Sequence, residues 1–143
     1  MALWHLMVGS VLFGITIEVL FTSIGDFIKK ENLKLQGNSY LWMFLVYALV
    51  PFIFMFILSF DISSIFVRAI FYMMGFYLLE LISGEIIKKL TGKCPWNYRS
   101  KPIIIFGKKF KTNFKGLINF DFIPFWYIYG LVGEFIYLFL EAL

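Results

Sequence analysis

Four long apolar stretches alternate with short polar segments along this chain. They cover residues 3–24, 39–60, 62–87 and 117–140. Each is long enough for a membrane-spanning helix, which needs about 20 residues. The pattern therefore predicts an all-α, polytopic membrane protein with four transmembrane helices, which form a single integral membrane domain over residues 1–143.

The second stretch differs from the other three because it contains no charged residue. Pro51 lies inside it and is expected to kink the helix, since proline removes one backbone donor. Asp61 marks a tight turn between the second and third stretches. Without polar positions to turn inward, the second helix is expected to be the most lipid-exposed of the four.

The basic residues predict which way the protein points. Twelve of the 13 Lys and Arg residues lie between Lys29 and Lys34 or between Lys88 and Lys115. Basic loops next to membrane spans stay in the cytoplasm. We therefore expect both basic loops, including the long one between the third and fourth helices, to be cytoplasmic. Both termini are then outside a bacterial cell (cytoplasmic) membrane, and no cleaved signal peptide is expected.

Composition supports the membrane interpretation. Hydrophobic residues make up 61% of the chain and aromatic residues 22%, against about 45–50% apolar residues in soluble domains. The net charge of +4 comes from residues beside the membrane, so anionic cytoplasmic head groups are the expected partner rather than nucleic acid.

Cys94 is the one cysteine, which excludes an intrachain disulfide.

Polar and small residues recur every four positions in three of the stretches. These stripes are Ser10, Gly14, Glu18 and Thr22; Arg68, Tyr72, Phe76, Glu80 and Gly84; and Trp126, Gly130 and Glu134. Residues four apart share one helix face. A charged side chain at a helix centre costs roughly 2.5–3.5 kcal/mol, so we expect each stripe to face other helices.

Depth along the predicted helices limits which ionisable groups can meet. Arg68 and Glu134 both lie toward the outer side and have opposite charge, which predicts a structural ion pair. Glu18 and Glu80 both lie toward the cytoplasmic side and are expected to approach each other. Two neighbouring carboxylates would share a proton or a cation. They are either a binding site or polar groups that pack between helices.

The long loop contains the most distinctive local sequence, Cys94 to Tyr98. Trp96, Asn97 and Tyr98 are candidate substrate-binding residues, although anchoring at the head-group level explains the aromatic rings equally well. Residues 102–106 predict a short hairpin or an interfacial segment. The chain has no nucleotide-binding loop, nucleophile elbow or metal-ligand pair. We therefore assign no cofactor, metal or catalytic residue, and enzymatic activity stays open.

Several of these segments together resemble a known family, the ABC-transporter permeases of the CmpB type (type IV), which have uncharacterised animal transmembrane-protein relatives. The segments are His5 to Thr22, Glu80 with Gly84, Cys94 to Tyr98, and Gly116 to Ile118 with Glu134. The resemblance covers nearly the whole chain. The sequence departs from the family pattern at Asn97, where Asp is usual, at Arg99, where Ser is usual, and by an apparent insertion over 101–109.

The resemblance and the polar stripes lead to one main hypothesis for function. We expect a small permease-like or transport-associated protein with an intramembrane carboxylate site for a cation, a proton or a lipid head group. The alternatives are an intramembrane lipid-modifying enzyme, with Glu18 or Glu80 as general base, and a non-catalytic assembly subunit. Further copies of the chain or other membrane subunits are the expected protein partners.

The orientation predicts how introduced cysteines will react. In a variant without Cys94, Gln36→Cys or Ile105→Cys should react with membrane-impermeant thiol reagents only from the cytoplasmic side, and Asp61→Cys only from outside. Labelling in right-side-out and inverted vesicles measures this. The reverse labelling would contradict the orientation, and Asp61→Cys labelled from inside would contradict the number of spans.

Overall fold

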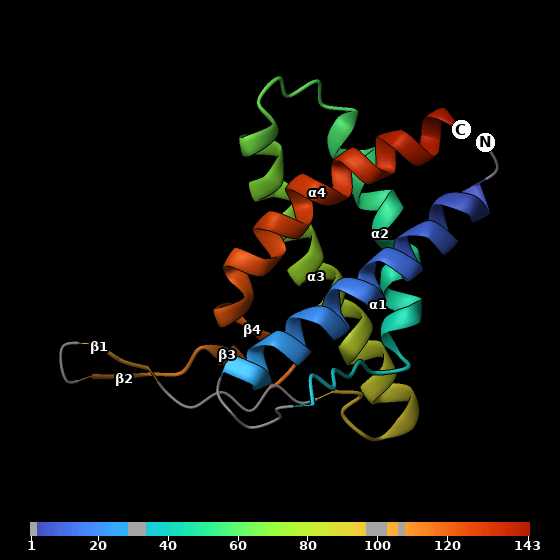
Figure 1. The fold of residues 1–143 in the computed structure, drawn as a ribbon. Helices are drawn as coiled ribbons and strands as arrows, with labels where there is room; N and C mark the ends of the chain where they lie inside the picture. Colours follow the sequence, from blue (N-terminus) through green and yellow to red (C-terminus); the bar gives the residue numbers. More distant parts are fainter. Residues whose placement is uncertain (1–2, 29–33, 97–102, 106–107) are drawn as a thin grey trace. The chain divides into compact units, whose positions relative to one another are not determined.

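The computed structural model describes residues 3–28, 34–96, 103–105 and 108–143. Figure 1 shows a mainly helical chain. Its helices are α1 (Leu3–Ile28), α2 (Met43–Leu58), α3 (Ile65–Thr91) and α4 (Ile123–Ala142). The 3-10 helix η1 (Phe120–Phe122) directly precedes α4.

The described helices are those of a multi-pass membrane protein. Three are long and apolar enough to cross a membrane: α1, α3, and α4 together with η1. The fourth, α2, is equally apolar but has 16 residues. At 1.5 Å per residue it is about 24 Å long, less than the roughly 30 Å of a bilayer's hydrocarbon core.

Local chemistry explains why α3 and α4 depart from the predicted ranges. α3 continues past residue 87 to Thr91 and ends at Gly92, which has a φ of 70° and donates its N–H to the carbonyl of Lys88. Glycine adopts this left-handed conformation without steric cost. α4 starts at Ile123 rather than residue 117, because Pro124 is tolerated in the first turn of a helix and not in its interior.

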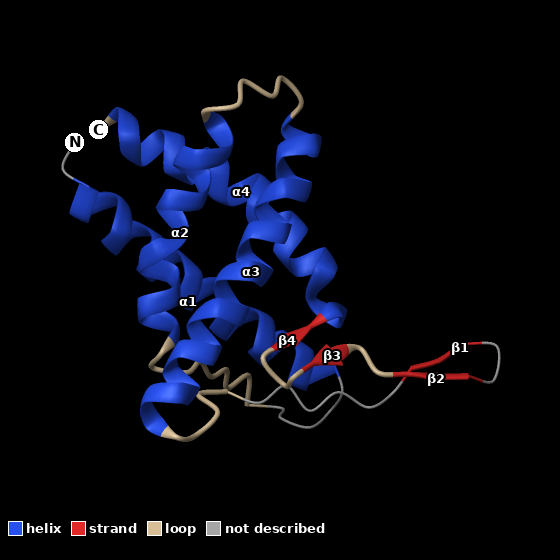
Figure 2. Ribbon diagram, turned by 180° about the vertical axis from the view of Figure 1, so that it is seen from behind, coloured by secondary structure: helices blue, strands red, loops and turns tan. Residues whose placement is uncertain are grey.

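Short strands occupy part of the connection between α3 and α4 (Figure 2). β1 (Ile103–Ile105) pairs antiparallel with β2 (Lys108–Phe110), which is the hairpin alternative of the sequence prediction. β3 (Asn113–Phe114) pairs with β4 (Ile118–Asn119). A tight turn that includes Gly116, whose φ is 72°, joins β3 to β4. The second hairpin leads directly into η1.

The chain divides into two compact units. The first contains Met1–Phe52 and Ile136–Leu143, and the second contains Ile53–Phe135. In the first unit the ring of Tyr47 lies against Gly14, where an added Cβ would be 2.3 Å from a ring carbon. The stripe glycine of α1 therefore allows α2 to approach closely.

The second unit packs around the stripe of α3. Tyr72, Phe76, Glu80 and Gly84 are all buried. The ring of Phe54 from α2 lies 4.6 Å from that of Tyr72, centroid to centroid. Aromatic rings of α4 complete the contact, because Phe76 lies 5.5 Å from Trp126 and 5.3 Å from Tyr129. This stripe faces other helices, as the sequence predicts.

The expectation that α2 is the most lipid-exposed helix is wrong. Buried residues recur along one of its faces, at Met43, Val46, Tyr47, Val50, Phe54 and Ile57. By contrast, the buried residues of the longer α1 are Leu6, Gly14 and Ser23. An apolar side chain gives the same sequence signal toward lipid as toward another helix, so the absence of polar residues does not indicate lipid exposure.

The contact between Gly14 and Tyr47 predicts opposite effects of two glycine substitutions in α1. Gly14→Ala should lower the thermal unfolding midpoint in detergent, because overpacking against a buried ring costs about 1–3 kcal/mol. Gly25→Ala is the matched control, since an added Cβ there meets nothing within 4 Å. It should leave the midpoint unchanged or raise it, because alanine favours a helix by about 0.5–1 kcal/mol. Equal shifts for both variants would contradict the packing.

Candidate functional site

An ion pair joins α3 to α4 at the residues that the sequence pairs. The Arg68 Nε donates to Glu134 Oε2 at 2.7 Å, and Nη2 donates to Oε1 at 2.5 Å. The Tyr72 hydroxyl adds a third bond, to Oε2 at 2.6 Å. Glu134 is only 2% exposed, and both of its carboxylate oxygens accept hydrogen bonds. This bidentate geometry is the strong form of an arginine–carboxylate interaction.

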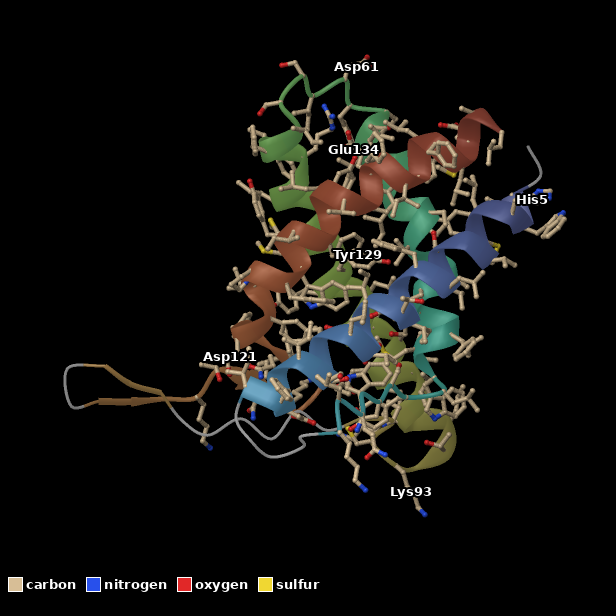
Figure 3. All side chains as sticks on the ribbon, in the orientation of Figure 1. His5, Asp61, Lys93, Asp121, Tyr129 and Glu134 are labelled. Carbon is tan, nitrogen blue, oxygen red and sulfur yellow. The ribbon has the colours of Figure 1, made fainter. Side chains whose placement is uncertain are left out.

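The same guanidinium also holds the turn between α2 and α3. Its Nη1 donates to the carbonyl oxygens of Ile62 and Ser63. Figure 3 labels Asp61 in this turn and Glu134 on α4. We call Arg68, Tyr72 and Glu134, with these two carbonyls, the outer clasp, after the side of the membrane on which the sequence predicts it. Arg68 therefore binds both α4 and the turn between α2 and α3. Within the outer clasp the positive charge of Arg68 and the negative charge of Glu134 neutralise each other, as expected of a group that serves helix packing.

Glu18 has a different environment on α1. The Ser39 hydroxyl donates to Glu18 Oε2 at 2.9 Å, and the Tyr47 hydroxyl donates to the same oxygen at 3.2 Å. Among the described residues, neither Lys nor Arg pairs with Glu18; the two ion pairs found there are Arg68–Glu134 and Lys115–Glu85. Its other oxygen, Oε1, accepts no hydrogen bond from that part of the chain.

The segment that brings Ser39 to Glu18 runs back along α1. We call residues 35–39 the docking segment. The Ser23 hydroxyl donates to the carbonyl of Leu35 at 2.8 Å. Thr22 Oγ1 donates to the carbonyl of Asn38 at 3.2 Å and accepts from its N–H at 3.1 Å. These bonds use one face of α1 and explain why α2 starts at Met43 rather than at residue 39.

Gly37 allows the docking segment to lie directly on the backbone of α1. A Cβ at this position would be 2.0 Å from the carbonyl oxygen of Val19, which no other residue type could tolerate in place. Neither Ser39 nor Tyr47 is among the site residues predicted from the sequence. The polar run from Gln36 to Ser39, beside the long apolar stretch, was the available signal.

Glu80, the second predicted carboxylate, is 1% exposed on α3. It belongs to the second compact unit, whereas Glu18 belongs to the first. The approach of the two carboxyl groups therefore stays a prediction.

Of the three candidate binding residues in the long loop, the structure describes one, Trp96. Trp96 is 1% exposed, and its indole N–H donates to the carbonyl of Leu117 at 2.9 Å. Both side chains lie against Gly84, where a Cβ would be 2.7 Å from Leu117 and 3.2 Å from Trp96. Two distant loop segments thus meet on α3. Asn97 and Tyr98 lie outside the described residues, so their role, and ligand binding by Trp96, stay predictions.

The described residues contain no group of three or more His, Cys, Asp or Glu side chains placed to hold a metal ion. No family model matches the chain, and no solved structure matches it. The described carboxylates offer two contrasting environments: Glu134 with a bound cationic side chain, and Glu18 with hydroxyl donors on one oxygen.

The outer clasp predicts strong coupling between its two charges. Arg68→Met should destabilise the detergent-solubilised protein by about 3–5 kcal/mol, because Glu134 loses its counter-charge while it stays buried. Arg68→Met with Glu134→Gln should be more stable than Arg68→Met alone. Unfolding free energies for this double-mutant cycle measure the coupling.

The ion pair of Lys115 and Glu85 is the matched control. Its nitrogen–oxygen distance is 2.9 Å, but the side chains are 52% and 28% exposed. Solvent weakens such a pair, so the cycle of Lys115→Met with Glu85→Gln should show little coupling. Strictly additive losses from Arg68→Met and Glu134→Gln would contradict the contact within the outer clasp.

Proposed function

We propose that this protein is a permease-like or transport-associated membrane protein whose intramembrane carboxylate site binds a cation, a proton or a lipid head group. The observation that carries the proposal is Glu18. It lies in a helix able to cross a membrane, and no described cationic side chain compensates it. A carboxylate in apolar surroundings needs a proton or a cation to be neutral. Glu80 is the second carboxylate of the proposed site.

The proposal includes four spans, with both termini outside and both basic loops in a bacterial cytoplasm. α2 falls about 6 Å short of a bilayer's hydrocarbon core. The four residues at 39–42 precede it, and a non-helical residue covers up to about 3.3 Å, which is enough to complete the span. Anionic lipids are the proposed partners of the basic loops. The resemblance to permeases of the CmpB type agrees with this function.

One observation favours a second candidate, a non-catalytic assembly subunit. The outer clasp and Trp96 satisfy their polar groups within the chain, as groups that serve only helix packing would. Glu18 separates the two candidates, because a purely structural carboxyl should tolerate replacement by an amide of the same shape.

The proposed function predicts that Glu18→Gln loses activity without unfolding. Purified protein in liposomes would be tested for H⁺, Na⁺ and K⁺ flux under imposed gradients, and for lipids retained after purification by mass spectrometry. Glu18→Gln should reduce the flux to that of empty vesicles, or should lose the retained lipid. Glu141→Gln, at an exposed carboxyl near the end of α4, is the matched control and should keep both. A wild-type protein with neither activity would contradict the proposal, as would a fully active Glu18→Gln.

A further inference from the structure

The surroundings of Glu18 limit what can compensate its charge. The hydroxyl donors come from the docking segment and from α2, through Ser39 and Tyr47. Of these, Tyr47 is the titratable group. None of the other titratable groups described in the same compact unit makes a hydrogen bond or an ion pair with Glu18; they are His5, Asp26, Lys34, Tyr40, Tyr137 and Glu141. The ligand of Glu18 must therefore come from outside the described chain.

The two oxygens of the carboxylate are unequal. Both hydroxyls donate to Oε2, and Oε1 accepts no hydrogen bond from a described residue. A proton can add to Oε1 while Ser39 and Tyr47 keep their positions. A metal cation needs several oxygen ligands, and the hydroxyls of Ser39 and Tyr47 could join Oε1 as ligands only if their hydrogens rotated away from Oε2. The geometry therefore favours a proton over a metal ion.

Protonation of Glu18 would weaken the hydrogen bond that holds Ser39 of the docking segment. A hydrogen bond to an ionised carboxylate is roughly twice as strong as one between neutral groups, so neutral Glu18 holds Ser39 less firmly. The bonds of the segment to Thr22 and Ser23 are between neutral groups.

From this geometry we propose that Glu18 binds one proton at Oε1 and that proton binding releases the Ser39 end of the docking segment from α1. The proton comes from the aqueous phase, and the new O–H bond leaves the carboxyl neutral. This inference rests on the proposed function and names the ligand of its site as a proton. Glu18 and residues 35–39 then act together as a proton-dependent gate.

A spin label at Tyr40, the residue next to Ser39, tests the gate. Tyr40 is 45% exposed, so Tyr40→Cys can carry a nitroxide in a Cys94→Ser background reconstituted in liposomes. The label should be immobile at mildly alkaline pH and mobile at mildly acidic pH, with a one-proton transition. Glu18→Gln imitates the neutral carboxyl and should give a mobile label at every pH. The matched control Glu141→Gln should keep the transition.

A second variant separates the gate from a general loss of structure. Ser39→Ala should give a mobile label at every pH, while infrared difference spectra still show a carboxylic acid forming on acidification, and that band should be absent from Glu18→Gln. A label that ignores pH in the parent protein overturns the inference, as does a pH transition that persists in Glu18→Gln.

The outcomes distinguish this inference from the function on which it rests. If Glu18→Gln abolishes a Na⁺ or K⁺ flux while the label ignores pH, the proposed function stands and the proton gate is wrong. If the label responds to pH through Glu18 while the wild-type protein neither transports nor retains lipid, the gate stands and the proposed function is wrong.

Discussion

A polar group inside a membrane-spanning helix must find its partner within the protein, because hydrocarbon offers none. This constraint accounts for the contacts of two described carboxylates: Glu134 receives a bidentate arginine and Glu18 receives two hydroxyls. The buried indole of Trp96, in the loop after α3, likewise donates to a backbone carbonyl. The buried indole N–H of Trp126 on α4 is the exception, because it has no hydrogen-bond partner among the described residues. The small residues of the stripes serve the same requirement, since a close approach at Gly14 or Gly84 brings the partner within reach.

The sequence predicts those features that depend on one helix at a time. Long apolar stretches predict the helices, and four-residue spacing predicts that the stripe of α3 is buried. Arg68 and Glu134 can be paired from their positions in the chain, because opposite charge at similar depth leaves few other partners. The hairpin in the long loop follows in the same way from an isoleucine run beside a glycine. Each of these predictions needs only a local pattern and a position along the membrane normal.

The features that the sequence does not predict arise where two segments come into contact, and neither segment alone has a pattern that indicates the contact. Ser39 lies at the start of the second apolar stretch, so the sequence predicts that it begins a membrane span. In the structure its hydroxyl bonds to Glu18, because Gly37 allows the chain to run back along α1. Tyr47 reads as one more aromatic residue of α2. The buried face of α2 carries no charged residue, so no periodic signal separates it from a face covered by lipid. Whether Glu18 and Glu80 meet also depends on how distant segments assemble.

The outer clasp has a consequence for the order in which the protein is built. Its two charges are 66 residues apart in the chain, and Glu134 on α4 is synthesised after Arg68 on α3. At ordinary synthesis rates several seconds separate the two residues. During that interval Arg68 lacks its counter-charge, and a long side chain near the end of a membrane-spanning helix can reach the head groups and water instead. The docking segment, by contrast, bonds to α1, which is made before it, so these contacts can form while the later helices are still being translated.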